Sequence, residues 1–62
     1  MTRKYELRKA EQGEVDARHS AEGYTGGEYD ALTGDYQVWL KGRVIGWAPT
    51  MGEAIRRAYA AA

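Results

Sequence analysis

The residues able to transfer protons or bind a metal ion are few. His19 is the only histidine, and Ser20 beside it is the only serine. Adjacent side chains diverge on a strand or a helix, so this pair cannot act as base and nucleophile. Asp16, His19 and Glu22 lie at three-residue steps and could share a metal ion on a helix, but neither a second histidine nor any cysteine completes the usual set of ligands. We therefore expect a solvated histidine at a loop edge, no metal site and no enzymatic activity.

The glycines and acids of the central segment also differ from known cofactor sites. Neither a Lys-Ser/Thr pair after Gly26-Gly27 nor a buried strand before it completes a phosphate-binding loop. Glu28, Asp30 and Asp35 lack the alternate spacing and the closing glutamate of a calcium loop. The sequence predicts no cofactor, and these glycines are expected to permit positive φ in turns.

Basic side chains suggest a different chemistry, the binding of nucleic acid. Four basic residues, together with Trp39, could form the binding face of a small nucleic-acid-binding protein. They are Lys41, Arg43, Arg56 and Arg57. The whole chain, however, has 9 Lys+Arg and 9 Asp+Glu, a formal net charge of zero. This balance favours an ordinary solvated helix face and hairpin tip, and nucleic-acid binding is kept as the alternative.

The charges are unevenly spread along the chain. Residues 1–18 carry five bases and four acids, residues 19–36 four acids without Lys or Arg, and residues 37–62 four bases and one acid. Such a dipolar chain favours a complementary protein partner over a nucleic acid.

The elements that position these side chains are clearest at 36–62. Residues 36–48 alternate apolar and polar side chains around Lys41-Gly42, which predicts a β-hairpin. A two-residue loop pairs Leu40 with Arg43, Val38 with Ile45 and Tyr36 with Trp47, and puts Trp39 opposite Val44 on the other face. A three-residue loop with a bulge, which would exchange the faces of the tryptophans, is the alternative.

A helix over 50–62 follows the hairpin. Pro49 ends the strand, and Thr50-Met51-Gly52-Glu53 matches a capping box. The spacing predicts an apolar stripe that packs on the sheet: Met51, Ala54, Ile55, Ala58 and Ala62. Ile55 is thus expected in the core, where its replacement by alanine would cost about 2–5 kcal/mol.

The first half of the chain is less regular. Residues 2–9 alternate, which predicts a charged edge strand, with a turn at Gln12-Gly13 and a short return strand over 14–18; a helix over 6–18 is the competing interpretation, opposed by Gly13. Residues 19–35 contain four glycines, two tyrosines and four acids, which predicts a loop. That loop is either a flexible connection or a binding loop, and Tyr29 with Leu32 could instead add a strand segment.

At 62 residues, the chain is expected to form a single small α+β domain. We predict an antiparallel sheet of three or four strands with one C-terminal amphipathic helix on one face. Zero cysteines and the lack of a signal peptide or long apolar run favour a reducing, cytoplasmic compartment.

A family resemblance concerns the C-terminal third. The run from Gly46 to Ile55, followed by Ala58, resembles the end of HicB-type antitoxin domains, where a strand leads through a short turn into a Thr-x-Glu-Glu-Ala helix start within a β-β-β-α unit. The family's longer Pro- and Gly-containing connection is absent between Leu40 and Val44. The resemblance implies a strand-then-helix topology, and we assign no family from it.

In size and composition, the chain is similar to small phage-encoded inhibitors, anti-CRISPR proteins among them. We therefore expect a non-enzymatic protein-binding module, an inhibitor or antitoxin-like factor from a phage or mobile element. It is expected to be a monomer or homodimer and not to associate with a membrane. An outward Trp39 would be its anchor. The expected contact residues are Trp39, Tyr24, Tyr29, Glu28, Asp30 and Asp35. In the structural alternative, the Trp39 ring folds over the N-terminal strand and extends the core.

Overall fold

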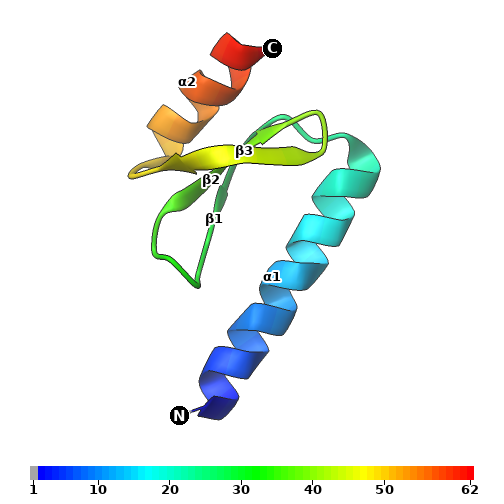
Figure 1. The fold of residues 1–62 in the computed structure, drawn as a ribbon, viewed down its shortest axis with the longest axis vertical. Coiled ribbons are helices and arrows are strands. Elements are labelled where there is room, and N and C mark those ends of the chain that lie inside the picture. The colour runs from blue at the N-terminus through cyan, green and yellow to red at the C-terminus, as the bar shows by residue number, and fades with distance from the viewer. Residues whose placement is uncertain (1) are drawn as a thin grey trace.

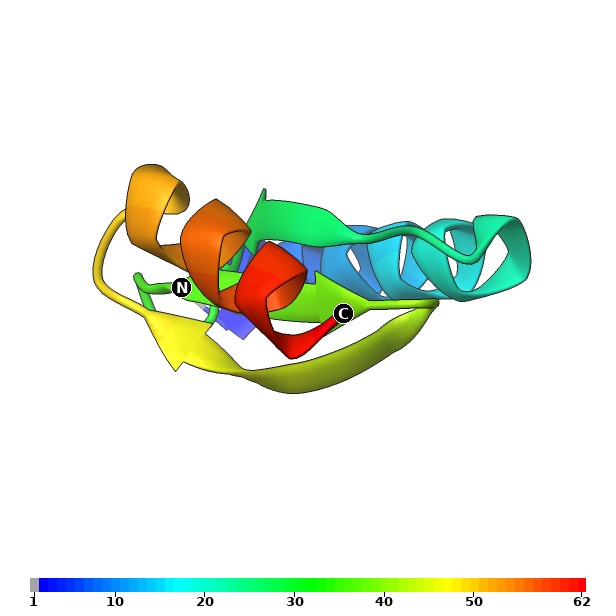
Figure 2. The same cartoon turned by 90° about the horizontal axis from the view of Figure 1, so that it is seen from above.

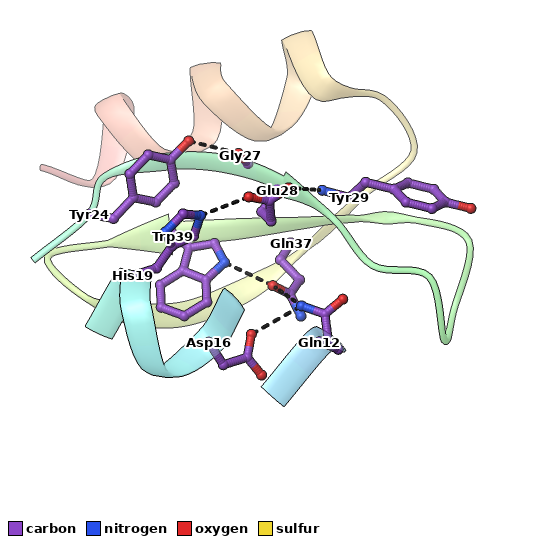
Figure 3. Close-up of polar contacts among 9 residues, drawn as sticks. All are labelled: Gln12, Asp16, His19, Tyr24, Gly27, Glu28, Tyr29, Gln37 and Trp39. Atoms are coloured by element: carbon purple, nitrogen blue, oxygen red, sulfur yellow. Dashed lines mark hydrogen bonds and ion pairs between the residues drawn. The ribbon is translucent and has the colours of Figure 1, made fainter. Parts of the chain in front are cut away.

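A three-stranded antiparallel sheet has one helix on each side, and the N-terminal half of the first helix extends beyond the sheet (Figures 1 and 3). The computed structural model describes the backbone of residues 2–62 and the side chains of residues 12–62. In chain order, the elements are α1 (Thr2–Glu22), β1 (Gly26–Tyr29), β2 (Tyr36–Leu40), β3 (Arg43–Ala48) and α2 (Met51–Ala61). The sheet has the order β1-β2-β3. The α+β class and the antiparallel sheet are confirmed, whereas the expectation of one helix is wrong because α1 covers the second face.

The N-terminal strands are the main error of the sequence prediction, since α1 runs without a break from Thr2 to Glu22. A single glycine costs a helix only about 1 kcal/mol, and the surrounding Ala, Glu, Gln, Lys, Arg and Leu residues all favour helix. Gly13 is exposed, and a Cβ there would meet no atom within 4 Å. The alternation over residues 2–9 therefore did not indicate a strand, and the side chains of that segment lie outside the described residues.

The segment 19–35 is not a continuous loop, because it contains the end of α1, the edge strand β1 and a turn. β1 pairs with β2 from Gly26 opposite Trp39 to Tyr29 opposite Tyr36. Tyr29 is therefore part of a strand, as the alternative interpretation allowed, whereas Leu32 lies in the following turn.

The hairpin between β2 and β3 has the predicted two-residue loop but a different register. Lys41 and Gly42 both adopt positive φ, 49° and 79°, which matches the twist of a primed turn. Leu40 pairs with Arg43 and Trp39 with Val44, as predicted, but Val38 then pairs with Gly46. Ile45 is thus an extra residue in β3, a bulge that moves every later side chain of β3 to the opposite face.

Small side chains form the apolar core between the sheet and α2. Val38 and Ala48 from the sheet contact Ala54 and Ala58 from α2, and Tyr36 packs against this cluster. Figure 2 shows α2 lying across the sheet, with β1 on one side and β3 on the other.

The Thr50 hydroxyl caps the start of α2 as predicted and accepts a hydrogen bond from the Glu53 backbone N–H at 3.2 Å. The Glu53 carboxylate of the predicted capping box instead bonds to Arg56 and Arg57. The outer stripe of α2 is not in the core. Ile55, expected in the core, is 40% exposed. Its replacement by alanine should therefore cost less than the 2–5 kcal/mol of a buried site, about 1 kcal/mol.

Gly27 sets the distance between β1 and α2, and this dependence can be tested. A Cβ at this position would lie 2.7 Å from Met51 Sδ and 3.0 Å from Ala54 Cβ. We predict that Gly27→Ala lowers the free energy of unfolding by about 1–3 kcal/mol, measured by urea denaturation, because α2 must shift away from the sheet. The control is Gly13→Ala, which fills open space within a helix and should stabilise the protein by about 1 kcal/mol. Unchanged stability in Gly27→Ala would contradict this packing.

Candidate functional site: a polar layer and an exposed tryptophan

Both tryptophans lie on the face of the sheet that α1 covers. Gln37 and Trp39 point to this face from β2, and the Ile45 bulge places Trp47 opposite Gln37. The sequence had predicted that Trp39 and Trp47 point to opposite faces. That prediction is wrong because it assumed an unbroken register.

Trp39, the expected anchor of a binding surface, is in the interior. Its side chain is 2% exposed, and its indole Nε1 donates a hydrogen bond to Gln37 Oε1 at 2.8 Å. The expectation of an outward Trp39 is therefore wrong, and the alternative, in which the ring extends the core, holds with a helix in place of the N-terminal strand. Trp47 is the exposed tryptophan, at 49%.

The amide of Gln37 joins three parts of the chain beneath the sheet (Figure 3). Its Oε1 also accepts a hydrogen bond from Gln12 Nε2 on α1 at 3.3 Å, and Gln12 bonds in turn to Asp16. Its Nε2 donates a long hydrogen bond of 3.4 Å to Asp30 Oδ2. Gln12 and Gln37 are both buried, so these bonds satisfy polar groups that would otherwise be costly to remove from water.

Asp30 organises the turn between β1 and β2. It is only 4% exposed. One carboxylate oxygen accepts hydrogen bonds from the backbone N–H groups of Leu32 and Thr33, and the other accepts one from the Trp47 indole at 2.8 Å. Burial alone would raise the pKa of Asp30, but the hydrogen bonds from Trp47, Leu32, Thr33 and Gln37 outweigh it and lower that pKa.

His19 attaches the end of α1 to β1. It is 8% exposed, and its Nε2 lies 2.7 Å from Glu28 Oε2. Because an ionised carboxylate only accepts, Nε2 carries the proton in this contact. The imidazole stacks on the Tyr24 ring at a centroid distance of 4.0 Å and meets the edge of Trp39 at 5.3 Å. The predicted solvated histidine is therefore wrong.

This histidine and carboxylate are poorly placed to act on a substrate. Nε2 is occupied by Glu28, and Nδ1 is buried without a hydrogen-bond partner. A general base needs a nitrogen within hydrogen-bond reach of the substrate, and neither nitrogen offers one in this arrangement. The pair fixes α1 to the sheet. Among the described residues, no three His, Asp or Glu side chains are grouped closely enough to hold a metal ion.

Side chains also occupy backbone groups at both edges of the sheet. The Tyr24 hydroxyl donates to the Gly27 carbonyl at 2.8 Å, and Glu28 Oε1 accepts from the Tyr29 N–H at 3.2 Å. Burial and the charge of Glu28 raise the pKa of Tyr24, so the hydroxyl stays a donor. On β3, Arg57 Nη1 donates to the Trp47 carbonyl at 3.0 Å. These contacts and the bulge make pairing with a foreign strand less favourable.

The predicted contact residues thus separate into two groups. Tyr24, Glu28, Asp30 and Trp39 hold the fold together, and Tyr29 and Asp35 are exposed. Sequence reasoning missed Gln12, Gln37 and the exposure of Trp47. The spacing of Gln12, Asp16 and His19 on one helix face was a usable signal, but only if α1 had been recognised.

Two of the four basic residues of the nucleic-acid alternative are paired with an acid. Arg56 and Arg57 both contact Glu53, at 2.6 and 3.1 Å. Hydrogen bonds from these two arginines, together with their charge, lower the pKa of Glu53. Lys41 and Arg43 are exposed at the hairpin turn. Part of the expected positive charge is therefore neutralised locally.

Large exposed apolar side chains are the other notable feature of the surface. Seven are at least 38% exposed among the described residues: Tyr29, Leu32, Ile45, Trp47, Met51, Ile55 and Tyr59. Single exposed apolar side chains are common on protein surfaces, whereas several that lie together mark a site of interaction.

Comparison of the chain with protein families, curated proteins and solved structures gives no significant match. No helix among the described residues is long and apolar enough to cross a membrane.

The role of Asp30 predicts a specific pH dependence. Because its pKa is lower in the folded than in the unfolded chain, its stabilising effect is complete above the unfolded carboxyl pKa of about 4 and is lost as the pH falls through the lower folded value. We predict that Asp30→Asn lowers the free energy of unfolding at pH 7 by about 1–3 kcal/mol, since two backbone N–H groups and an indole lose a charged acceptor.

Urea denaturation between about pH 2 and pH 7, the range in which carboxyl groups titrate, measures this effect. The difference between wild type and Asp30→Asn should shrink towards acid pH. The exposed Asp35→Asn is the matched control and should change stability little. A constant difference across the pH range would contradict the proposed role of the Asp30 charge.

A double-mutant cycle tests the contact between His19 and Glu28. We predict that His19→Ala and Glu28→Gln are coupled by about 1 kcal/mol in urea denaturation, because His19→Ala removes the partly buried hydrogen bond that Glu28→Gln weakens by replacing a charged acceptor with a neutral one. The control cycle combines His19→Ala with Glu22→Gln, an exposed acid on the same helix, and should be additive. Additive effects in both cycles would show that the contact does not hold α1 on the sheet.

Proposed function

We propose that the chain is a non-enzymatic protein-binding module whose contact surface is centred on Trp47. The single observation behind this proposal is a half-exposed tryptophan whose orientation is already fixed. The ring is 49% exposed while its Nε1 donates to the buried Asp30 carboxylate at 2.8 Å. Tryptophan is enriched among residues that dominate binding energy, and a side chain ordered before binding loses less entropy on association.

Two exposed residues of the turn that Asp30 organises extend this surface. Leu32, 38% exposed, follows Asp30 in the turn, and its backbone N–H bonds to the same carboxylate. Asp35 closes the turn, with its carbonyl accepting the Asp30 N–H at 2.9 Å, and is exposed. We call Leu32, Asp35 and Trp47 the Trp47 surface. It combines an aromatic anchor, an aliphatic neighbour and an acid at the rim, a composition that suits a protein partner.

The titratable side chains in the polar layer are all bonded to other groups of the protein, which supports binding over catalysis. His19 and Glu28 bond to each other, and Asp30 bonds to internal donors. Each of these groups is used to hold α1 or the turn in place. We propose that the protein acts by covering a surface of its partner, as a small inhibitor of phage or mobile-element origin in a bacterial cytoplasm would.

Nucleic-acid binding is the alternative function. It would use Lys41, Arg43, Arg56 and Arg57, of which the last two are bonded to Glu53. Binding through these residues would lose affinity steeply with rising salt concentration. A protein contact centred on Trp47 would depend less on salt, because its anchor is uncharged.

Affinity purification of the tagged protein from bacterial lysate, with and without nuclease, tests the proposal. We expect a stoichiometric protein partner that survives nuclease, identified by mass spectrometry. With that partner purified, Trp47→Ala should weaken binding by about 30-fold or more, the effect of losing an anchor residue. Trp47→Phe, which keeps a ring but loses the bond to Asp30, should have an intermediate effect.

The matched control is Tyr59→Ala, which removes a more exposed aromatic side chain, at 63%, from a different part of the surface. It should leave binding unchanged. Circular dichroism of each variant verifies that the fold is retained. Equal capture by wild type and Trp47→Ala would place the contact elsewhere. Material that is lost on nuclease treatment would favour nucleic acid.

A further inference from the structure

The outer flank of α2 carries an apolar stripe separate from the Trp47 surface. Met51, Ile55 and Tyr59 are 38%, 40% and 63% exposed and lie at i, i+4 and i+8. On a helix this spacing covers roughly 80° of the circumference. The stripe borders the edge strand β1: Met51 and Ile55 are the neighbours that a Cβ on Gly27 would meet, and the Tyr59 hydroxyl lies 3.5 Å from the Thr25 carbonyl.

The neighbouring edge of the sheet restricts what can cover this stripe. The Gly27 carbonyl and the Tyr29 N–H of β1 already bond to the Tyr24 hydroxyl and the Glu28 carboxylate. An added strand would have to displace these two side chains. A helix that packs along α2 through its side chains would leave both of these hydrogen bonds in place.

The lack of charge on the stripe favours a partner whose contact surface is also apolar and uncharged. The stripe itself has no charged residue, and Arg56 at its outer margin is bonded to Glu53 at 2.6 Å. A strongly charged partner would therefore gain no specific ion pair. A second copy of a chain with zero net charge meets no overall repulsion.

The order of residues in the stripe makes it self-complementary. If two copies of α2 cross in antiparallel orientation at Ile55, Ile55 meets Ile55 and each Met51 meets the partner's Tyr59. Methionine sulfur packs favourably against aromatic rings, and antiparallel helices align their dipoles favourably. A two-fold symmetric dimer requires such a patch, because the same surface is used by both copies.

We infer that the stripe of Met51, Ile55 and Tyr59 is a homodimer interface in which two copies of α2 pack antiparallel about a two-fold axis at Ile55. Three partly exposed side chains per copy form a smaller contact than a standard stable interface, and a contact of this size supports only weak, transient association. The dimer is therefore weak, with a dissociation constant on the order of 10–100 μM. It leaves the Trp47 surface of each copy accessible.

Sedimentation equilibrium of the full chain, from about 5 to about 500 μM so as to bracket that constant, tests the inference. The expected result is a rise in mass from the 6.9 kDa of one chain towards twice that value. Ile55→Glu should weaken the dimer by at least about 100-fold, because two like charges would meet at the axis. Ile45→Glu is the control, since Ile45 is similarly exposed, at 48%, but lies on β3.

Mixing charge variants makes the test specific for two-fold contact. Ile55→Glu and Ile55→Lys should each be monomeric alone, whereas an equimolar mixture should form a dimer because opposite charges then meet at the axis. Circular dichroism verifies that both variants fold. Only a contact between residue 55 and its own copy gives this pattern.

Two results would overturn the inference: a wild-type mass of one chain at every concentration, or a dimer that Ile55→Glu leaves unchanged. If the wild type stays monomeric and Ile55→Glu instead loses the captured protein partner, the stripe belongs to that partner's site. The inference is independent of the proposed function, because Trp47→Ala should leave the dimer intact and Ile55→Glu should leave binding at Trp47 intact.

Discussion

A buried hydrogen-bonded amide lies at the centre of the structure. Gln37 occupies the middle strand and faces α1, where an apolar side chain would be expected. Its amide accepts from Gln12 and Trp39 and donates to Asp30. Removing Gln37 would leave the buried Trp39 indole N–H without its acceptor, which costs about 1–3 kcal/mol. This one side chain therefore links α1, Trp39 and the turn that Asp30 organises.

The two faces of the sheet are therefore held together by different forces. On one face, Val38 and Ala48 meet the alanines of α2 in an apolar core. On the other, Gln12 and His19 attach α1 through hydrogen bonds and ring stacking. Hydrogen bonds need specific geometry, whereas apolar packing is non-directional. The polar face consequently sets the orientation of α1, and it also contains Trp39, the largest fully buried side chain among the described residues.

The same polar face shapes the surface offered to partners. The Asp30 carboxylate accepts a hydrogen bond from the turn and another from the indole of Trp47, so it fixes the orientation of the exposed ring. Side chains occupy backbone groups at the sheet edges, so both proposed contacts use exposed apolar side chains rather than the strands. Among the described residues, few apolar side chains are buried and several large ones are exposed, and the polar layer contributes to stability in their place.

The sequence by itself determined the elements whose signals are local. The Lys41-Gly42 turn, the Thr50 cap and the helix after it depend on neighbouring residues, and all three formed as predicted. Only the tertiary structure decided the rest. The Ile45 bulge reverses the face of Trp47, because register depends on which face of the strand is buried. The docking of α1 and the pairing of β1 depend on partners distant in the sequence: His19 bonds to Glu28, and Gly27 leaves room for α2. Contacts of this kind leave no periodicity in the chain, so no local pattern could have predicted them.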